Sequence, residues 1–313
     1  MKSIKVEEEQ MKRLESNIQI TLALKAKEEK MKGLESKHQI TLVLRALVAI
    51  VCLFALSAPA WGKENAQESD AAALAKKLSN PISALISLPV QFNWDENYGP
   101  LEEGSKSFIN VQPVIPISLN ETWNLISRTI LPLAIEQRDL APGSGSQNGR
   151  GDIVQSLFFS PQEPTSGGLI WGVGPVLLFP TATDDLLGGE KWGIGPTGVL
   201  LKQTGPWTYG ALFNHVWSFA GEDDRDDIDL TFLQPFVSYT TPKAWTIALN
   251  AESTYNWETE VWAVPVNLMV KKVIRLGKQP VSVVAGVRYW ADSPDNGADG
   301  WGVRLEVNFL FPK

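Results

Sequence analysis

The sequence is poor in the residues on which most catalytic and metal centres depend. Its 313 residues include one cysteine, Cys52, and two histidines, His38 and His215. Because a disulfide needs two thiols and Cys52 lies in an N-terminal apolar run, the chain beyond it has neither a disulfide nor a thiolate nucleophile. A histidine-based metal site or a Ser-His-Asp arrangement there would depend on His215 alone. The sequence therefore predicts no catalytic residue, no cofactor and no metal site.

Long apolar runs and basic charge are also scarce. A membrane-spanning helix needs about 20 apolar residues, and no stretch after Ser69 comes close to that length. The 28 Lys and Arg are outnumbered by 35 Asp and Glu, which gives a net charge of −7. Since nucleic-acid binding needs a clustered basic surface, the composition predicts no nucleic-acid partner.

The N-terminus has the pattern of an export signal. Ala46 to Leu56 is an unbroken apolar stretch, with basic residues before it and Ser57-Ala58-Pro59-Ala60 after it. A basic region, an apolar core of about 7–15 residues and a small-residue site are typical of a secretory signal peptide. We expect cleavage after Ala60 and export of the remainder.

A repeat precedes this signal. Residues 8–26 recur as residues 28–46, at an offset of 20. Two copies are too few for a solenoid, so we interpret the repeat as a local duplication or as the result of a start assigned too early. The true start is then Met1, Met11 or Met31. A coiled-coil arm is the alternative.

In the rest of the chain, apolar and polar residues alternate. Val303, Leu305, Val307, Phe309 and Phe311 alternate with Arg304, Glu306, Asn308 and Leu310, and successive side chains of a strand point to opposite faces. Similar segments, separated by Gly, Pro, Asn and Asp, predict twelve strands. They span about 83–94, 106–117, 122–136, 151–160, 168–180, 191–203, 206–220, 229–241, 244–256, 261–275, 280–291 and 301–311.

The loops between these strands sort by parity. Counted from the first strand, the odd connections are longer almost everywhere than the even ones, and they hold the Gly/Ser-rich residues 141–151 and the acidic residues 222–229. An outer-membrane barrel alternates long outer loops with short periplasmic turns. The pattern predicts an all-β fold, a closed antiparallel transmembrane barrel of about 12 strands spanning residues 81–313. A linker over residues 61–80 precedes it and holds a short helix over Asp70 to Leu78.

Tryptophan and proline qualify this prediction. The 12 Trp residues fit membrane interfaces, and they also fit a secreted β-sandwich that binds carbohydrate, which is the alternative fold. Proline cannot donate to a strand ladder, so we expect each proline within a strand to lie at a bulge or near a rim. These prolines are Pro113, Pro132, Pro175, Pro196, Pro235 and Pro265.

Several charged or polar residues lie opposite apolar rows and should line the barrel lumen. In a pore such groups set selectivity, whereas in a narrow barrel inward Arg–Glu pairs fill the interior. The structural interpretation, a plugged barrel without transport, is the stronger of the two. The predicted lumen-lining residues are Arg128, Arg288, Arg304, Glu306 and Asn308.

Two further features have plain explanations. His215 lies in an aromatic row with Phe213 and Trp217, which favours an interfacial position over catalysis; an outer-membrane phospholipase would need a nucleophile beside it. The carboxylates of residues 222–229 lack the spacing and the glycine of a calcium loop, which favours a solvated outer loop.

Several motifs are similar to those of one bacterial family. They are Asn80 to Pro89, Val111 to Pro116, Trp123 to Pro132, Gly151 to Ile153 with Phe158 to Pro161, Trp171 to Pro175, Phe179 to Thr183 and Phe309 to Lys313. Over residues 70–313 the chain resembles outer-membrane proteins often named "transporter", or misleadingly "neuromedin U", which belong with a family named for a phenol meta-pathway component.

The resemblance implies an outer-membrane β-barrel that passes small, in some cases aromatic or hydrophobic, molecules, and it supplies no catalytic residues. The partners we expect are outer-membrane lipid, the barrel-assembly machinery and a small-molecule solute. The segments also contain the prolines, which marks them as features of the fold.

Overall fold

The computed structural model describes residues 64–140 and 144–312. The predicted signal peptide with its cleavage site at Ala60, the duplication and the candidate starts Met1, Met11 and Met31 lie outside the described residues. Within the described part, no helix is long and apolar enough to cross a membrane.

One helix, α2 (Glu64–Leu78), precedes the strands, and it begins earlier than the predicted Asp70. The first half of the sheet comprises β1 (Ile86–Tyr98), β2 (Gly104–Val111), β3 (Val114–Ser118), β4 (Trp123–Arg138), β5 (Ser146–Gly149), β6 (Ile153–Pro161), β7 (Leu169–Phe179) and β8 (Lys191–Thr204). The second half comprises β9 (Trp207–Gly221), β10 (Asp229–Thr240), β11 (Trp245–Ala251), β12 (Ser253–Asn256), β13 (Val261–Ala263), β14 (Pro265–Leu276), β15 (Gln279–Trp290) and β16 (Gly300–Phe311).

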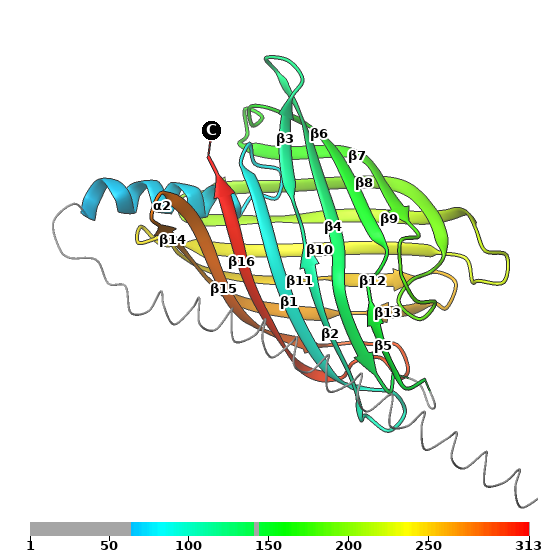
Figure 1. Cartoon of the computed structure of the whole chain (residues 1–313). Helices are drawn as coiled ribbons and strands as arrows, with labels where there is room; N and C mark the ends of the chain where they lie inside the picture. Colours follow the sequence, from blue (N-terminus) through cyan, green and yellow to red (C-terminus); the bar gives the residue numbers. More distant parts are fainter. Residues whose placement is uncertain (1–63, 141–143, 313) are drawn as a thin grey trace, which may run out of the picture. The chain divides into compact units, whose positions relative to one another are not determined.

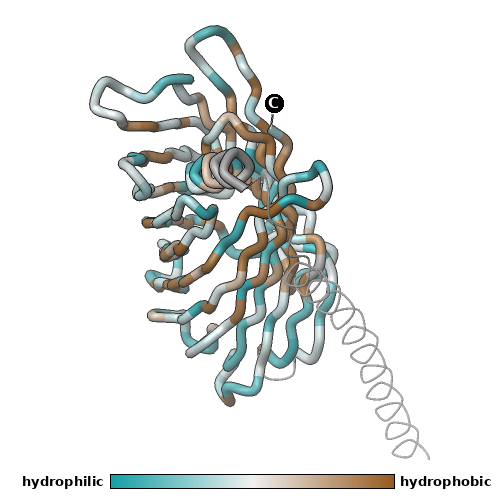
Figure 2. The backbone as a smooth tube through the Cα atoms, turned by 90° about the vertical axis from the view of Figure 1, so that its left-hand side faces the viewer, coloured by the Kyte–Doolittle hydropathy of each residue, from teal (hydrophilic) through white to brown (hydrophobic). Residues whose placement is uncertain are grey.

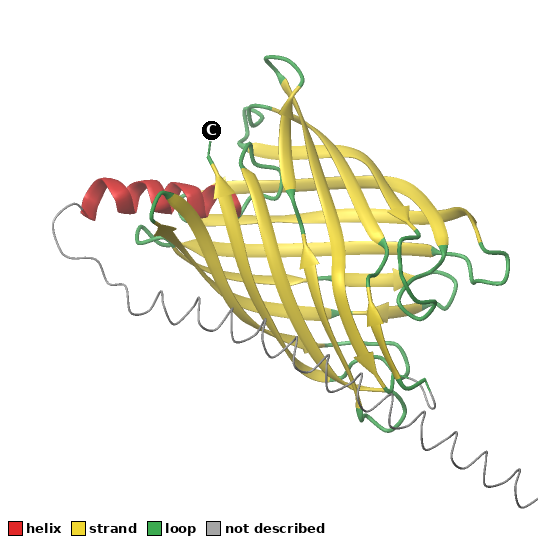
Figure 3. Cartoon of the chain, viewed as in Figure 1, coloured by secondary structure: helices red, strands yellow, loops and turns green. Residues whose placement is uncertain are grey.

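These strands form one closed antiparallel barrel (Figures 1 and 3). Neighbouring strands pair around the ring, and β1 pairs with β16, which closes it. Four pairs of short strands run end to end, namely β2 with β3, β5 with β6, β11 with β12, and β13 with β14. When each pair is counted as one strand, the ring has 12 strands. The predicted twelve-strand barrel is confirmed, and a β-sandwich is excluded because a sandwich leaves open sheet edges.

Proline explains several irregularities of the ladder. The predicted strand 106–117 is interrupted before Pro113, and the predicted strand 261–275 is interrupted at Val264, before Pro265. At Pro132 the register between β2 and β4 shifts, so Leu133 forms a bulge. These positions agree with the expectation, since a residue without an N–H cannot complete a ladder.

For Pro175 and Pro196 the expectation of a bulge or rim position is wrong. The two prolines pair with each other in an unshifted ladder between β7 and β8. On their other sides the ladders to β6 and β9 skip residues at this height. Because the two prolines lie opposite each other, the N–H groups that they lack are missing at the same height. One is missing from the ladder to β6 and the other from the ladder to β9.

The two ends of the barrel differ. At one end, here called the helix end, α2 lies, β1 begins and β16 finishes (Figure 1). The opposite end, here called the loop end, carries most of the long connections, including residues 180–190 and 222–228. The predicted sorting of loops by parity is therefore confirmed, with residues 162–168 as the one long connection at the helix end.

The outer surface is an apolar belt between two aromatic girdles. Leu249, Leu268 and Val287 are among the outward residues at mid-height. Figure 2 shows the apolar positions recurring along the strands. At the helix end Trp123 packs against Trp171 and Trp207 against Tyr239; at the loop end Phe179 packs against Trp192 and Tyr289 against Trp301.

The spacing of the girdles can be read along β9, whose outward row contains Trp207 and Trp217. At about 3.3 Å per residue, the strand between them extends about 33 Å. A tilt of about 40° reduces this to a height of about 25 Å, the height of the apolar band on outer-membrane barrels.

The helix α2 packs against the helix end. Leu74 and Ala75 are buried with Ala244, Val273 and Leu310. The Lys76 ammonium donates to the carbonyl of Gly205 at 2.6 Å, and the Gln203 amide donates to the carbonyl of Lys76 at 2.9 Å. Residues 70–78 therefore fold back onto the barrel.

Candidate functional site

The barrel interior contains two adjoining cavities. The larger has a volume of about 430 Å³ and the smaller, next to Leu78 and Ser79 after α2, about 160 Å³. Arg128, Gln234, Asn250, Met269 and Lys271 line both cavities, so the cavities meet at these five residues. We call this place the neck.

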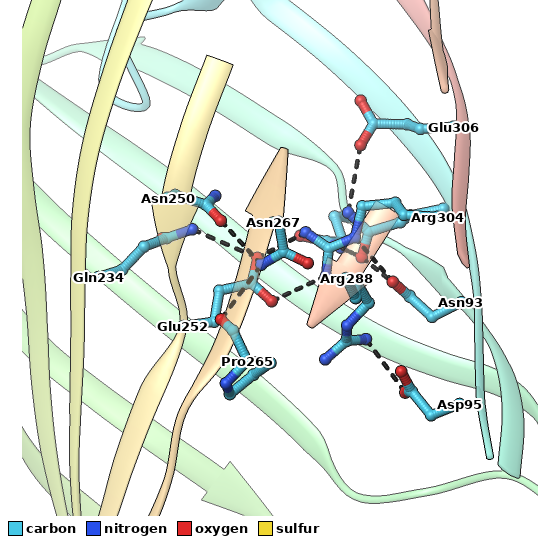
Figure 4. A network of polar contacts seen from close by, with 12 residues as sticks. Asn93, Asp95, Gln234, Asn250, Glu252, Pro265, Asn267, Arg288, Arg304 and Glu306 are labelled. Atoms are coloured by element: carbon cyan, nitrogen blue, oxygen red, sulfur yellow. Dashed lines mark hydrogen bonds and ion pairs between the residues drawn. The ribbon is translucent and has the colours of Figure 1, made fainter. Parts of the chain in front are cut away.

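An ion pair crosses the larger cavity. Arg304 of β16 donates from both terminal nitrogens to the two carboxylate oxygens of Glu252, each at 2.7 Å, and from Nε to Asn93 Oδ1 at 2.7 Å (Figure 4). This fork-to-fork geometry is the strongest form of the arginine–carboxylate contact. Because β14 and β15 lie between the two strands in the ring, the pair bridges non-neighbouring strands through the lumen, and it is here called the crossbar.

Glu252 faces the lumen in the same row as Asn250 and Thr254, at a point where the strand is interrupted. It lies between β11 and β12, and its N–H donates to the carbonyl of Pro265 at 3.0 Å. Pro265 has no N–H to return, so the ladder breaks at this point. On the opposite side, the Gln234 amide donates to Glu252 Oε1 at 3.4 Å.

A second chain of polar contacts runs along the β1 side. Gln91 donates to Glu306 at 3.2 Å and accepts from Asn93 at 3.1 Å and from Gln112 at 3.3 Å. Arg128 then donates to Gln112 at 3.2 Å. These amides connect Glu306 to Arg128 indirectly, with no direct contact between the two charges.

A third group lies toward the loop end. Arg288 forms an ion pair with Asp95 at 3.3 Å, although the described residues give these two facing atoms no well-aligned hydrogen bond. The Trp290 indole donates to Asp95 at 3.1 Å, and the Arg288 guanidinium lies over the Trp290 ring at 5.4 Å. Gly302 lies beside this pair. A Cβ atom at this position would come within 2.3 Å of Asp95 Oδ1.

The opposite wall of the larger cavity is apolar. Side chains from β4, β6, β7, β9 and β10 supply it, where the sequence places aliphatic residues on the inward row. They are Ile130, Val154, Val176, Leu178, Val216, Leu230 and Phe232. The lumen therefore has a charged side, which runs from Glu252 after β11 through β14, β15, β16 and β1 to Arg128 of β4, and a mainly apolar side, which runs from β4 to β10.

Of the residues predicted to line the lumen, the structure places Arg128, Arg288, Arg304 and Glu306 on the wall of the larger cavity. Asn308 is inward but lies outside the cavity lining, 6% exposed, and its Oδ1 accepts no hydrogen bond from the described residues.

Sequence reasoning missed other residues of the site. Glu252, Lys271 and Gln91 also line the cavity, and Asp95 supports Arg288. Alternation could have found them, since Gln91, Asn93 and Asp95 alternate with Phe92 and Trp94.

His215 lies on the outer surface, next to Trp217 at 4.1 Å between ring centres. Its Nδ1 is 2.7 Å from Thr231 Oγ1 and its Nε2 is 3.1 Å from Asp229 Oδ1. This order resembles a hydrolase triad, but Thr231 Oγ1 also accepts from the Trp257 indole at 2.8 Å, which engages one lone pair of the oxygen that would have to attack and makes it a weaker nucleophile.

The acidic loop-end segment is held by two ion pairs. Arg225 pairs with Glu190 at 3.0 Å, and Lys191 with Asp227 at 3.4 Å. No group of three potential metal-ligating side chains occurs in the part of the chain that the structure describes. These pairs tie residues 222–229 to the neighbouring loop.

Comparison with known proteins supports the fold. No family model matches the chain, and no curated protein matches it. Among solved structures, an outer membrane channel from Pseudomonas putida F1 superimposes with a TM-score of 0.58 at 13% identity, over 73% of this chain and 96% of that one. The NanC porin gives 0.46 at 9% identity, over 73% and 100% of the two chains. An outer membrane phospholipase from Salmonella typhi gives 0.42 at 13%, over 79% and 98%.

Proposed function

We propose that this chain is a channel of the bacterial outer membrane through which small molecules pass passively. The observation that carries the proposal is the pair of adjoining cavities inside a closed barrel, with charged side chains spanning the larger one. Inward charges at a narrow place are the means by which pores select solutes. The similarity to the Pseudomonas putida channel is in keeping with this role.

The outer-membrane location is part of the same proposal. The apolar belt and the paired aromatic girdles support it, as does the N-terminal pattern of residues 37–60. Outer-membrane lipid and the barrel-assembly machinery are then the partners that the chain needs. We expect the protein to fractionate with the outer membrane and to migrate faster in gels when unheated. Recovery in the soluble periplasm would contradict the location.

Liposome swelling with solutes of graded size tests the channel. We expect the wild-type protein to admit only small solutes, because the crossbar obstructs the larger cavity. Removing the crossbar with the double substitution Arg304→Ala and Glu252→Ala should raise the permeation rate and the size limit. Arg150→Ala, on an exposed residue at the loop end, is the control and should change neither.

A barrel without transport is the second candidate. Its support is the helix-end half of the interior, where Ile126, Phe158 and Leu201 pack with Ile82 in a buried cluster beside α2. If neither the wild type nor the crossbar variant admits any solute, this candidate replaces the channel.

We also propose that the His215 cluster is structural and that the chain has no enzymatic role. Membership of the outer-membrane family named in connection with phenol degradation stays a prediction from the sequence segments. A phospholipase assay separates the two roles of the cluster: activity that disappears in both His215→Ala and Thr231→Val would establish an enzyme.

A further inference from the structure

The neck between the two cavities contains two cationic side chains. Arg128 comes from β4 and Lys271 from β14, strands that lie almost opposite each other in the ring. Both side chains line both cavities. Anything that passes from one cavity to the other therefore passes between these two cations.

Neither cation has an acidic partner within the described residues. Every ion pair found there involves other side chains, and Arg128 makes one side-chain hydrogen bond, to the neutral Gln112. Arginine has five N–H donors and lysine three, so most of their donor capacity is left for a ligand. Leaving two charges unmatched inside a barrel is costly unless something occupies them.

The carboxylates of the cavity, Glu252 and Glu306, act on these cations through space but form no direct contact with them. Glu252 is held by both terminal nitrogens of Arg304, and Glu306 is held by Gln91. Four basic and two acidic residues line the larger cavity, so its lining has a charge of +2. Asp95, behind the lining, pairs with Arg288, and Glu252 pairs with Arg304, so the positive charge without an ion-pair partner lies at the neck.

The rest of the wall determines what kind of anion fits. The surface facing the charged side is built mainly from aliphatic side chains and Phe232, with Asn214 and Gln234 as its polar members. Such a surface binds an apolar body and offers few hydrogen bonds to a strongly hydrated inorganic ion. The volume of about 430 Å³ lies within the usual range of small-molecule sites, about 300–1,000 Å³. The planar guanidinium of Arg128 matches the two oxygens of a carboxylate.

We propose that the neck is a binding site for a small organic carboxylate with an apolar body. Arg128 and Lys271 hold the carboxylate, and the body lies against the aliphatic wall. The inference deepens the proposed function by naming a solute class, and it rests on that function only for the solute's route, because binding can be measured on the isolated barrel.

Isothermal titration calorimetry on the purified full-length barrel in detergent tests the site, with benzoate, neutral benzamide and acetate as probes. We expect benzoate to bind at least tenfold more tightly than benzamide, which lacks the charge, and than acetate, which lacks the ring. Each charge-assisted hydrogen bond contributes about 1.5–3 kcal/mol, or about tenfold or more in affinity. Equal binding of benzoate and benzamide overturns the cationic site, and equal binding of benzoate and acetate overturns the apolar part.

The matching variants are Arg128→Gln and Lys271→Gln, alone and combined. The control is Lys272→Gln, the next residue of β14, whose ammonium lies over the outward Trp245 ring at 5.1 Å. We expect the combined variant to lose at least tenfold in benzoate affinity and the control to retain it. Lys271→Arg keeps the positive charge and should retain the affinity for benzoate that Lys271→Gln loses. The comparison separates the effect of the lost charge from that of a lost fold. Retained affinity in the folded combined variant overturns the proposal.

Planar-bilayer recordings distinguish this inference from the channel itself. With a salt gradient across the membrane, the reversal potential of the wild type should indicate preference for anions, and the combined variant should shift toward cations. A conducting wild type with no anion preference overturns the role of the neck and leaves the channel intact. A wild type that does not conduct at all overturns the channel, while benzoate binding still decides the site.

Discussion

Glu252 shows how much one side chain can depend on one partner. Its carboxylate is inside the barrel, and Arg304 supplies both charge and geometry. Removing one member of a buried ion pair leaves the other uncompensated, which costs about 3–5 kcal/mol, whereas replacing both is far less damaging. Arg304 and Glu252 should therefore be substituted both singly and together.

Arg304→Met is expected to lower the free energy of unfolding by about 3 kcal/mol or more, because Glu252 remains charged and unpaired. Adding Glu252→Gln should recover part of that loss. Urea titration of the barrel in lipid vesicles measures both, as a double-mutant cycle. If the losses of the two single variants simply add in the double variant, the two side chains are not coupled.

Gly302 is required by contact with Asp95 and not by backbone conformation. A methyl group there would lie 2.3 Å from Asp95 Oδ1. Gly302→Ala should displace Asp95 from Arg288 and destabilise the barrel by about 1–3 kcal/mol. Gly198→Ala on β8, where the nearest atoms are 3.8 Å away, is the matched control. Equal unfolding midpoints for the two variants would contradict this explanation.

At the scale of elements, α2 is held by its own contacts with the helix end. Leu74 is buried against the barrel, while the preceding residue, Ala73, is exposed. Arg275 adds an ion pair to Asp70 at 3.6 Å, but both side chains are substantially exposed, so this pair contributes little. The attachment of α2 therefore depends mainly on apolar burial.

Leu74→Asp should detach α2 without unfolding the barrel, because it places a charge in an apolar contact. The expected result is faster trypsin cleavage at Lys76 and Lys77, with the barrel fragment uncut. Ala73→Asp introduces the same charge on the exposed side and should leave the cleavage rate unchanged. Equal cleavage of wild type and Leu74→Asp would show that the helix is not anchored by Leu74.

Most strands were readable from the sequence because they have one apolar and one polar row. Alternation and the turn residues between segments located the twelve strands, and the loop lengths indicated which end carries the long loops. The breaks at Glu252 and at Val264 were not readable, because they arise when Pro265 fails to donate to a neighbouring strand. Which proline faces which residue is set by the register of the closed ring, and the partnering of Glu252 with Arg304 depends on it as well.

At the scale of the molecule, the outer surface of the barrel is suited to lipid and its inner surface to water. Outward residues such as Leu268 and Leu249 are half exposed, at 49% and 44%, whereas the inward row carries arginine and glutamate. In water this arrangement would be unfavourable, since soluble proteins rarely expose apolar patches of such extent. A lipid environment makes both rows favourable at once.

If the belt lies in lipid, the cost of an outward arginine should depend on its depth in the membrane and not on the residue that it replaces. Leu268 and Leu276 are both outward leucines of β14, one near mid-height and the other the last residue of the strand. Leu268→Arg should cost about 2–4 kcal/mol of folding free energy in lipid vesicles, as charges do at the bilayer centre, and Leu276→Arg about 0–1 kcal/mol near the interface. Urea-dependent folding into vesicles measures the difference. If both arginines cost the same, the belt does not lie in lipid, because in water the two exposed positions are equivalent and only a bilayer distinguishes them.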